Sequence, residues 1–336
     1  MKNGRSGMIR LRVGYLITGI ITGLLLILSF FATIPDGKLH VIICDVGQGD
    51  GIYVRFPNGK DMVVDGGPAS PSQGGPGNKI IGCLSRHMPF WDRTIDIAVL
   101  THPEKDHING LISVLERYRI NYVLRSDIIN NTEGYATFER LIKEKYIDEK
   151  RVVTGSHINI GSTALSVLWP TESQIARMKP AIPLQSSNSA QGVLGTSTTS
   201  TPNLNDGSVV LYLSYGTFDV LLPGDADSHV DRELSIQIPN DPDGIEIFKI
   251  PHHGSKTGMT DAFLQKLSFA RPGLAKLKNK KPLAVISVGN NSYGHPAPEV
   301  IQRLESAGFQ VLRTDKAGDI EVVSDGREWQ YTVTKN

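Results

Sequence analysis

Four residues able to bind a metal ion lie within six consecutive positions of this chain: His102, Glu104, Asp106 and His107. Imidazole and carboxylate groups bind divalent ions, and two such ions about 3.5–4 Å apart can activate a water molecule for hydrolysis. In an extended segment, His102 and Glu104 point the same way, whereas Asp106 and His107 follow as the chain turns into a helix. The spacing therefore predicts two pairs of ligands, one for each of two ions.

A strand and a helix must position this cluster. The apolar run 95–100 predicts a short buried strand, and residues 108–119 carry apolar side chains at helical spacing. The ligands thus lie on a strand-to-helix loop, where a rigid sheet holds side chains that project into a cleft. An isolated His-x-Glu on a polar loop is more often a surface feature, but further clusters of the same chemistry occur downstream.

Those clusters also follow predicted strands. Asp225 leaves a hydrophobic strand through Gly224, His252 and His253 follow an alternating strand, and His295 follows another. Open α/β sheets place their sites at such strand ends. Because adjacent loop residues point in different directions, we expect only one of the two neighbouring histidines to bind metal.

Three aspartates end the first predicted strands: Asp45, Asp50 and Asp65. Most such residues form turns, and one of them is a candidate to support the metal ligands by hydrogen bonding. The glycines nearby do not form a nucleotide-binding loop, because Ile52 stands where G-x-G-x-x-G requires its third glycine.

The composition is that of a globular protein with a nearly balanced charge. The chain has 336 residues, 40% of them hydrophobic, and a formal net charge of +1. A globally basic nucleic-acid-binding protein is therefore excluded, and contact with DNA would need a local patch. The two cysteines, Cys44 and Cys83, lack zinc-ligand or redox-motif spacing, and we expect buried thiols rather than a disulfide.

The amino-terminal segment predicts membrane attachment. Residues 1–12 are basic, and residues 13–34 contain no charged side chain. As a helix these 22 residues would span about 33 Å, the thickness of the hydrocarbon core. The basic flank should remain in the cytoplasm and place the domain 37–336 outside it. The alternative is a cleaved signal peptide and a secreted domain, although the apolar run is long for a signal.

A second change in composition lies between residues 172 and 203, which are rich in Ser, Thr, Gly, Ala and Gln. We expect a flexible loop here, because the segment offers little to bury. The Ser/Thr run 195–201 leads towards the strand before Asp225, so it is a candidate lid over the site.

Taken in order, the motifs resemble the metallo-β-lactamase superfamily, and within it the hydrolase domains attached to competence DNA-uptake channels. The similarity spans about residues 38–325. It implies an αββα sandwich, in which two sheets carry helices on their outer faces and a binuclear site lies at one edge. The residues that carry the resemblance are Asp45–Asp50, Thr101–Gly110, Asn205–Ser208, Gly224–Asp225, His252–Ser255 and Tyr293–Pro296.

The resemblance also implies roles for individual residues. Glu104 stands where the superfamily commonly has histidine, and the usual mid-chain histidine ligand is missing, with Asn205 or Ser208 nearby instead. More carboxylates and fewer nitrogens favour Mn²⁺ or Mg²⁺ relative to Zn²⁺. The implied metal ligands are His102, Glu104, Asp106, His107, Asp225 and His253; the implied catalytic residues are Asp106 and, as proton donors, His295 or His252; and the candidate substrate contacts are Ser255, Lys256, Asn205 and Ser208.

The sequence thus predicts a membrane-anchored, exported hydrolase that uses two divalent metal ions, either Mn²⁺ or Zn²⁺. Only one hydrophobic segment is long enough to span a bilayer, which argues against a DNA channel in this chain alone. Phosphodiester cleavage, with DNA as one possible substrate, is our first expectation. The alternatives are hydrolysis of a lactam, ester or amide, and a degenerate metal-stabilised binding module. The sequence identifies no protein partner.

Overall fold

The computed structural model describes residues 15–25, 34–68, 79–179, 203–239, 244–268 and 280–335. Residues 15–25 form a helix, while the rest of the predicted membrane segment 13–34, apart from Ile34, lies outside the described residues, as do residues 1–12 and the Ser/Thr run 195–201. Within the described residues, none of the helices combines the length and the apolar character needed to cross a bilayer.

The first of two sheets has eight strands in the order β15-β14-β1-β2-β3-β4-β5-β6. Strands β3 to β6 are parallel to one another, and the remaining neighbours are antiparallel. The strands are β1 (Leu39–Ile43), β2 (Ile52–Arg55), β3 (Asp61–Val64), β4 (Thr94–Leu100), β5 (Arg119–Arg125), β6 (Asp148–Arg151), β14 (Ile320–Ser324) and β15 (Trp329–Val333).

The second sheet has seven strands in the order β13-β12-β11-β10-β9-β8-β7. Here β10 to β13 are parallel, and β7 to β10 are antiparallel. The strands are β7 (His157–Ile160), β8 (Thr163–Trp169), β9 (Val210–Tyr215), β10 (Phe218–Leu222), β11 (Ile247–Lys249), β12 (Leu283–Ile286) and β13 (Gln310–Arg313).

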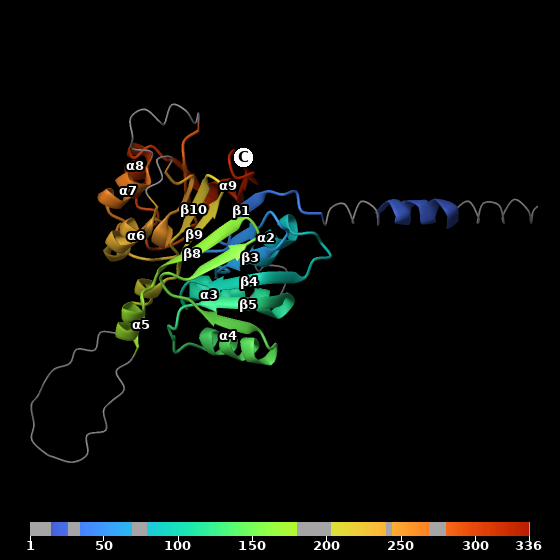
Figure 1. Ribbon diagram of the computed structural model, residues 1–336, viewed down its shortest axis with the longest axis horizontal. Helices are drawn as coiled ribbons and strands as arrows, with labels where there is room; N and C mark the ends of the chain where they lie inside the picture. The colour runs from blue at the N-terminus through green and yellow to red at the C-terminus, as the bar shows by residue number, and fades with distance from the viewer. Residues whose placement is uncertain are drawn as a thin grey trace, which may run out of the picture.

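Three hydrophobic layers hold the sheets and helices together. The alternation of buried side chains places one face of each sheet against the other, and this central core contains Val54 and Val99 from one sheet and Leu211 and Val220 from the other. The opposite faces pack against helices on the two outer sides of the molecule (Figure 1). These helices are α2 (Lys79–His87), α3 (Lys105–Arg117) and α4 (Glu133–Glu144) on the first sheet, and α6 (Asp231–Gln237), α7 (Asp261–Leu267) and α8 (Pro298–Ser306) on the second.

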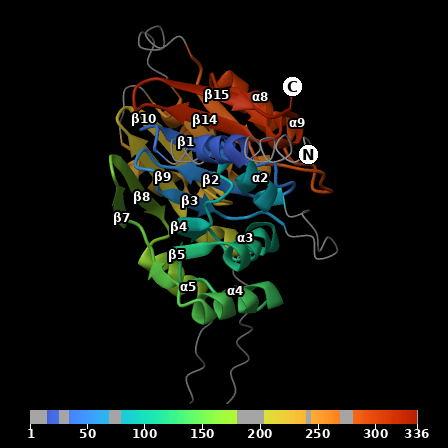
Figure 2. The same cartoon turned by 90° about the vertical axis from the view of Figure 1, so that its right-hand side faces the viewer.

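This architecture confirms the predicted αββα sandwich. The two ends of the folded domain meet in one sheet, because β14 pairs antiparallel with β1, as Figure 2 shows. The remaining short elements are α5 (Glu172–Met178), α9 (Thr314–Ala317), η1 (Leu204–Gly207), η2 (Ser228–Val230) and η3 (Pro251–Gly254).

The start of the predicted flexible loop 172–203 needs correction. Residues 172–178 form helix α5, in which the Thr171 hydroxyl caps the first turn by accepting a hydrogen bond from the Gln174 amide, and Ile175 is buried. A capped turn with one buried apolar anchor is enough to order this segment against the domain. Residues 180–202 of the predicted loop lie outside the described residues.

The prediction of free buried thiols was wrong. Cys44, which follows β1, and Cys83, on α2, form a disulfide across a sequence separation of 39 residues. Both side chains are fully buried, as expected. The strand-end position of Cys44 and the inward face of α2 bring the two sulfurs together, and neither signal is visible as a spacing motif.

Candidate metal centre

The candidate ligands converge because the strands that precede them are parallel within each sheet, β3 with β4 and β10 with β11. Asp65 follows β3, His102 follows β4, Asp225 follows β10 and His253 follows β11, while Asp106 and His107 lie in the first turn of α3. The predicted strand-end placement of the cluster is therefore confirmed.

Close backbone packing fixes the start of α3 against the loop after β3. The amide of Gly66 donates to the carbonyl of His107 at 2.9 Å, and the amide of Gly110 donates to Gly67 at 2.8 Å. A Cβ atom on Gly110 would lie 1.8 Å from the Gly66 carbonyl oxygen, so the approach requires glycine. This contact places His107 beside Asp65.

Three histidines contact a supporting group through the same ring nitrogen, Nδ1, which leaves Nε2 for the site. The Nδ1 atom of His107 lies 2.8 Å from Asp65 Oδ2, that of His253 lies 3.0 Å from the Ser287 carbonyl oxygen, and that of His102 lies 3.3 Å from Ser208 Oγ. If each Nδ1 carries the proton, each Nε2 keeps a free lone pair. Among the described residues, all three Nε2 atoms are buried without a hydrogen-bond partner.

Two of those nitrogens, on His107 and His253, face one carboxylate oxygen. Oδ2 of Asp225 lies 3.3 Å from His107 Nε2 and 3.2 Å from His253 Nε2, and Asp106 Oδ2 lies 3.4 Å from His253 Nε2. Ligands about 2.1 Å from one ion are about 3.0–3.4 Å apart in octahedral or tetrahedral geometry. The four side chains of Asp106, His107, Asp225 and His253 therefore fit a divalent ion.

The buried carboxylates of this group favour positive charge on the groups around them. Burial opposes the imidazolium form of His107 and His253, but Asp225 and neighbouring carboxylates outweigh it and raise the pKa of both rings well above the usual range. Burial favours a neutral Asp225, yet the same two histidines and Lys249 hold its pKa well below the usual range. A bound cation would take over the role that these protons play.

His102 and Glu104 lie beside this four-residue group rather than within it. The rings of His102 and His107 have centroids 4.1 Å apart, and burial, followed by the charge of His107, lowers the pKa of His102 to about 3. A neutral histidine with a free Nε2 is suited to metal binding. Glu104 lines a cleft together with Asp106, Asp225 and His253, so its carboxylate is available for a second ion.

A buried lysine in the site was not anticipated from the sequence. Lys249 ends β11 with no exposed surface, and its ammonium group contacts Asp50 Oδ2, the Gly224 carbonyl oxygen and Asp225 Oδ1. Burial lowers the pKa of Lys249, but Asp50 and Asp225 outweigh burial and raise it, so the group is charged. The alternating strand pattern showed that Lys249 leads into the histidine pair, yet it could not show which acids would meet it.

The two neighbouring histidines point in different directions, and only His253 belongs to the four-residue group. Both His252 and His253 have left-handed backbone, with φ of 48° and 54°, so their rings diverge by 77°. His253 turns towards Asp225 and Asp106, whereas His252 Nδ1 lies 3.4 Å from Asp227 Oδ1. The His252 ring also lies 5.6 Å, centroid to centroid, from His295.

These two histidines line an open cleft of about 520 Å³ above the metal ligands. The hydrogen bond from His252 to Asp227 raises the pKa of His252, whereas burial and the neighbouring His252 lower that of His295. Exposed Tyr293 lies beside His295, with ring centroids 5.9 Å apart. The cleft is lined by Gln48, Pro68, Glu104, Lys105, Asp106, Asn130, Thr132, Leu204, Asp225, His252, His253, Tyr293 and His295.

The four predicted substrate contacts have different surroundings. Ser208 supports the ligands directly, since its hydroxyl lies 3.3 Å from both His102 Nδ1 and the Asp225 amide. Asn205 is buried in η1. Ser255 contacts the Thr257 hydroxyl, and the exposed Lys256 lies 3.0 Å from Glu299. A role for these residues in substrate binding stays a prediction.

Residues 44–270 match the sequence profile of the metallo-beta-lactamase superfamily, which spans the ligand loops described above. The chain belongs to this superfamily. It is 24% identical over 335 residues to ComE operon protein 3 of Bacillus subtilis (strain 168), and 23% identical over 291 residues to competence protein ComA of Neisseria gonorrhoeae. These alignments cover 95% and 86% of this chain but only 37% and 33% of the relatives. The chain thus spans about a third of each relative.

Solved structures show weaker similarity. The metallo-beta-lactamase fold protein YhfI from Bacillus subtilis has 10% identity and a TM-score of 0.47, with 84% of this chain and 99% of that chain covered. Igni18, a metallo hydrolase from Ignicoccus hospitalis, has 14% identity and a TM-score of 0.48, with 84% and 98% covered.

Proposed function

We propose that this domain is a metal-dependent phosphodiesterase, with DNA among its candidate substrates. The observation that supports the proposal most strongly is the convergence of His107 Nε2 and His253 Nε2 on Asp225 Oδ2. The site would hold one divalent ion through Asp106, His107, Asp225 and His253, and His102 and Glu104 would be ligands for a second. Bound ions would polarise the phosphoryl group and activate water.

The chain's own residues account for the remaining steps. Asp65, Ser287 and Ser208 hold the histidine rings in the orientation that ligation needs. His252, held by Asp227 at the cleft wall, is the proton donor to the leaving oxygen. Lys105 lines the same cleft and would supply a positive charge near a phosphate group.

We further propose that the domain is exported and attached to the membrane by residues 13–34. The Cys44–Cys83 disulfide supports this location, because disulfides persist in oxidising compartments and are rare in the cytosol. A reporter that is active only in the cytoplasm, fused after Asn336, should be inactive. An active fusion would contradict export.

The test of function uses the full chain, purified in detergent and loaded with either Mn²⁺ or Zn²⁺. We expect bound metal by elemental analysis, together with hydrolysis of DNA and of bis-p-nitrophenyl phosphate. Asp225→Asn should lose at least one ion and about 10²-fold or more in rate, as for removal of a major electrostatic contributor. Cleavage of a chromogenic lactam or ester instead would favour the second enzyme class. Metal-free wild-type protein with no activity would favour a binding module.

A further inference from the structure

Lys249 is fully buried, and its only ionic contacts among the described residues are the carboxylates of Asp50 and Asp225. The Gly224 carbonyl oxygen, at 3.0 Å, completes three acceptors for the three ammonium hydrogens. A buried lysine with every donor satisfied is held in one position, because losing any of these contacts would leave a charged donor without a partner.

The two oxygens of Asp225 consequently have different surroundings. Oδ1 lies 3.5 Å from Lys249 Nζ, whereas Oδ2 faces His107 Nε2 and His253 Nε2. An ion that approached Oδ1 would lie against the ammonium group and be repelled by it. The lysine therefore restricts metal binding by Asp225 to a single oxygen.

Asp50 contacts both Lys249 and the segments that carry His253 and Asp106. Its Oδ1 atom lies 3.5 Å from His253 Nδ1, and its backbone amide donates to the Asp106 carbonyl oxygen at 3.2 Å. Removing only the lysine charge would leave Asp50 buried beside the metal ligands without its cation. Removal of both charges separates the effect on folding from the effect on metal binding.

We propose that Lys249 is a positioning residue of the metal centre, which fixes Asp225 so that only Oδ2 is presented to the ions. This inference rests on the proposed metal-dependent function, but its first readout is metal affinity rather than hydrolysis. The lysine acts through Asp225 and does not touch the substrate. Residues that orient ligands in this way change metal affinity or activity by about 10–100-fold when they are replaced.

The experiment compares Lys249→Met, Asp50→Asn and the double variant with the full-length wild type. Dissociation constants for Mn²⁺ and Zn²⁺ are measured by competition with a chromogenic chelator, and Tm is measured in EDTA. We expect Lys249→Met to have a lower Tm in EDTA than the double variant, because it leaves Asp50 uncompensated. The double variant should fold but bind metal about 10–100-fold more weakly than wild type.

Asp50→Asn alone should lose less metal affinity than the double variant, because Lys249 still contacts Oδ1 of Asp225. Lys145→Met is the matched control, since Lys145 also donates to backbone carbonyls, those of Leu115 and Glu116, in the last turn of α3, at the opposite end of that helix from Asp106 and His107. Wild-type affinity in the double variant, or equal loss in Asp50→Asn and the double variant, would overturn the inference.

A failure of the proposed function would give a different experimental result from a failure of this inference. If wild-type protein binds metal but does not cleave phosphodiesters, the affinity measurements still decide the role of Lys249. If phosphodiesters are cleaved, a lower kcat with an unchanged KM in the double variant is expected, since Asp225 positions the ions and not the substrate.

Discussion

The Nδ1 atom of His107 lies 2.8 Å from Oδ2 of Asp65, and both side chains are completely buried. Asp65 also accepts hydrogen bonds from the amide and the hydroxyl of Thr101, at 2.9 and 2.6 Å. The two oxygens of Asp65 thus accept three hydrogen bonds. In an asparagine at this position, the NH₂ group would replace one oxygen and would face at least one of these donors. The carboxylate is needed to orient the first metal-ligand loop.

Asp65→Asn should therefore weaken metal binding and turnover by about 10–100-fold, the range found when partners of histidine ligands are replaced. Metal content after dialysis and initial rates at saturating metal are the measurements. Asp45→Asn is a suitable control, because Asp45 also follows a strand of the first sheet but contacts Lys79 and Lys335. Equal losses in the two variants would contradict a specific role for Asp65.

Two helical glycines allow the packing of α3 to be tested. Gly110→Ala should destabilise the protein by about 1–3 kcal/mol, the cost of overpacking, because its Cβ would collide with the Gly66 backbone. Gly82→Ala on α2 should be neutral or stabilising by up to about 1 kcal/mol, since alanine favours helix and the nearest atom is the end of the Arg86 side chain, 3.4 Å away. Chemical denaturation of both variants gives the comparison, and similar midpoints would refute close packing as the reason for Gly110.

Much of the fold and of the site could be predicted because the signals are local. Short apolar runs identified the strands, and ligand types at strand ends predicted the candidate metal residues that the structure brings together, including Asp225 and His253. Parallel strands end at the same side of a sheet, so their loops meet without any knowledge of the strand order.

What the sequence could not show depends on contacts between distant segments. Lys249 meets Asp50 across about 200 positions, and Cys44 meets Cys83 only because α2 packs on the first sheet. Which of the three strand-end aspartates would lie beside the candidate ligands was likewise open, and packing places Asp65 beside His107 and Asp50 beside His253. These relations follow from the packing of the two sheets and not from spacing along the chain.

The proton-donor role of His252 can be separated from that of His295 by the choice of leaving group. The hydrogen bond to Asp227 raises the pKa of His252, so it holds a proton to higher pH than an ordinary histidine. His252→Asn should slow cleavage of DNA, which has a poor leaving group, by about 10²–10⁴-fold. A p-nitrophenyl substrate needs little protonation and should be much less affected. Equal effects on both substrates, or a selective loss in His295→Asn instead, would assign the proton to another group.

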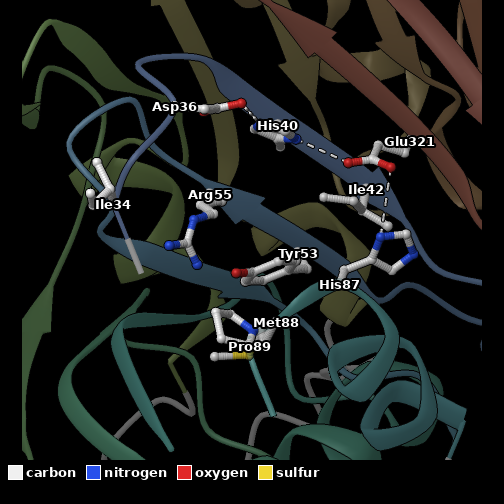
Figure 3. Close-up of a pocket in the computed structure, with 10 residues that line it drawn as sticks. All are labelled: Ile34, Asp36, His40, Ile42, Tyr53, Arg55, His87, Met88, Pro89 and Glu321. Carbon is white, nitrogen blue, oxygen red and sulfur yellow. Dashed lines mark hydrogen bonds and ion pairs between the residues drawn. The ribbon is translucent and has the colours of Figure 1, made fainter. Parts of the chain in front are cut away.

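A second histidine cluster, remote from the metal ligands, makes stability depend on pH. Figure 3 shows His40 between Asp36 and Glu321 in a pocket on the helix-facing side of the first sheet, with His87 beyond Glu321. The His40 ring nitrogens lie 2.9 Å from Asp36 Oδ2 and 3.0 Å from Glu321 Oε1, and His87 Nδ1 lies 3.8 Å from Glu321 Oε2. Burial lowers the pKa of His40, but hydrogen bonds to Glu321 and Asp36 outweigh it, and the net pKa lies above 6.5.

Because the folded-state pKa is raised, protonated His40 stabilises the fold below the unfolded pKa of 6.5, and this contribution is lost as pH rises through the folded-state value. His40→Gln should therefore have a lower free energy of unfolding than wild type at pH 5–6, and the difference should shrink towards pH 8–9. Denaturation at a series of pH values, with metal and salt held constant, measures this difference. His157→Gln is the control, because the His157 ring contacts the Ser166 hydroxyl. A stability difference that stays constant with pH, or one that grows as pH rises, would show that His40 is not held in its charged form by Asp36 and Glu321.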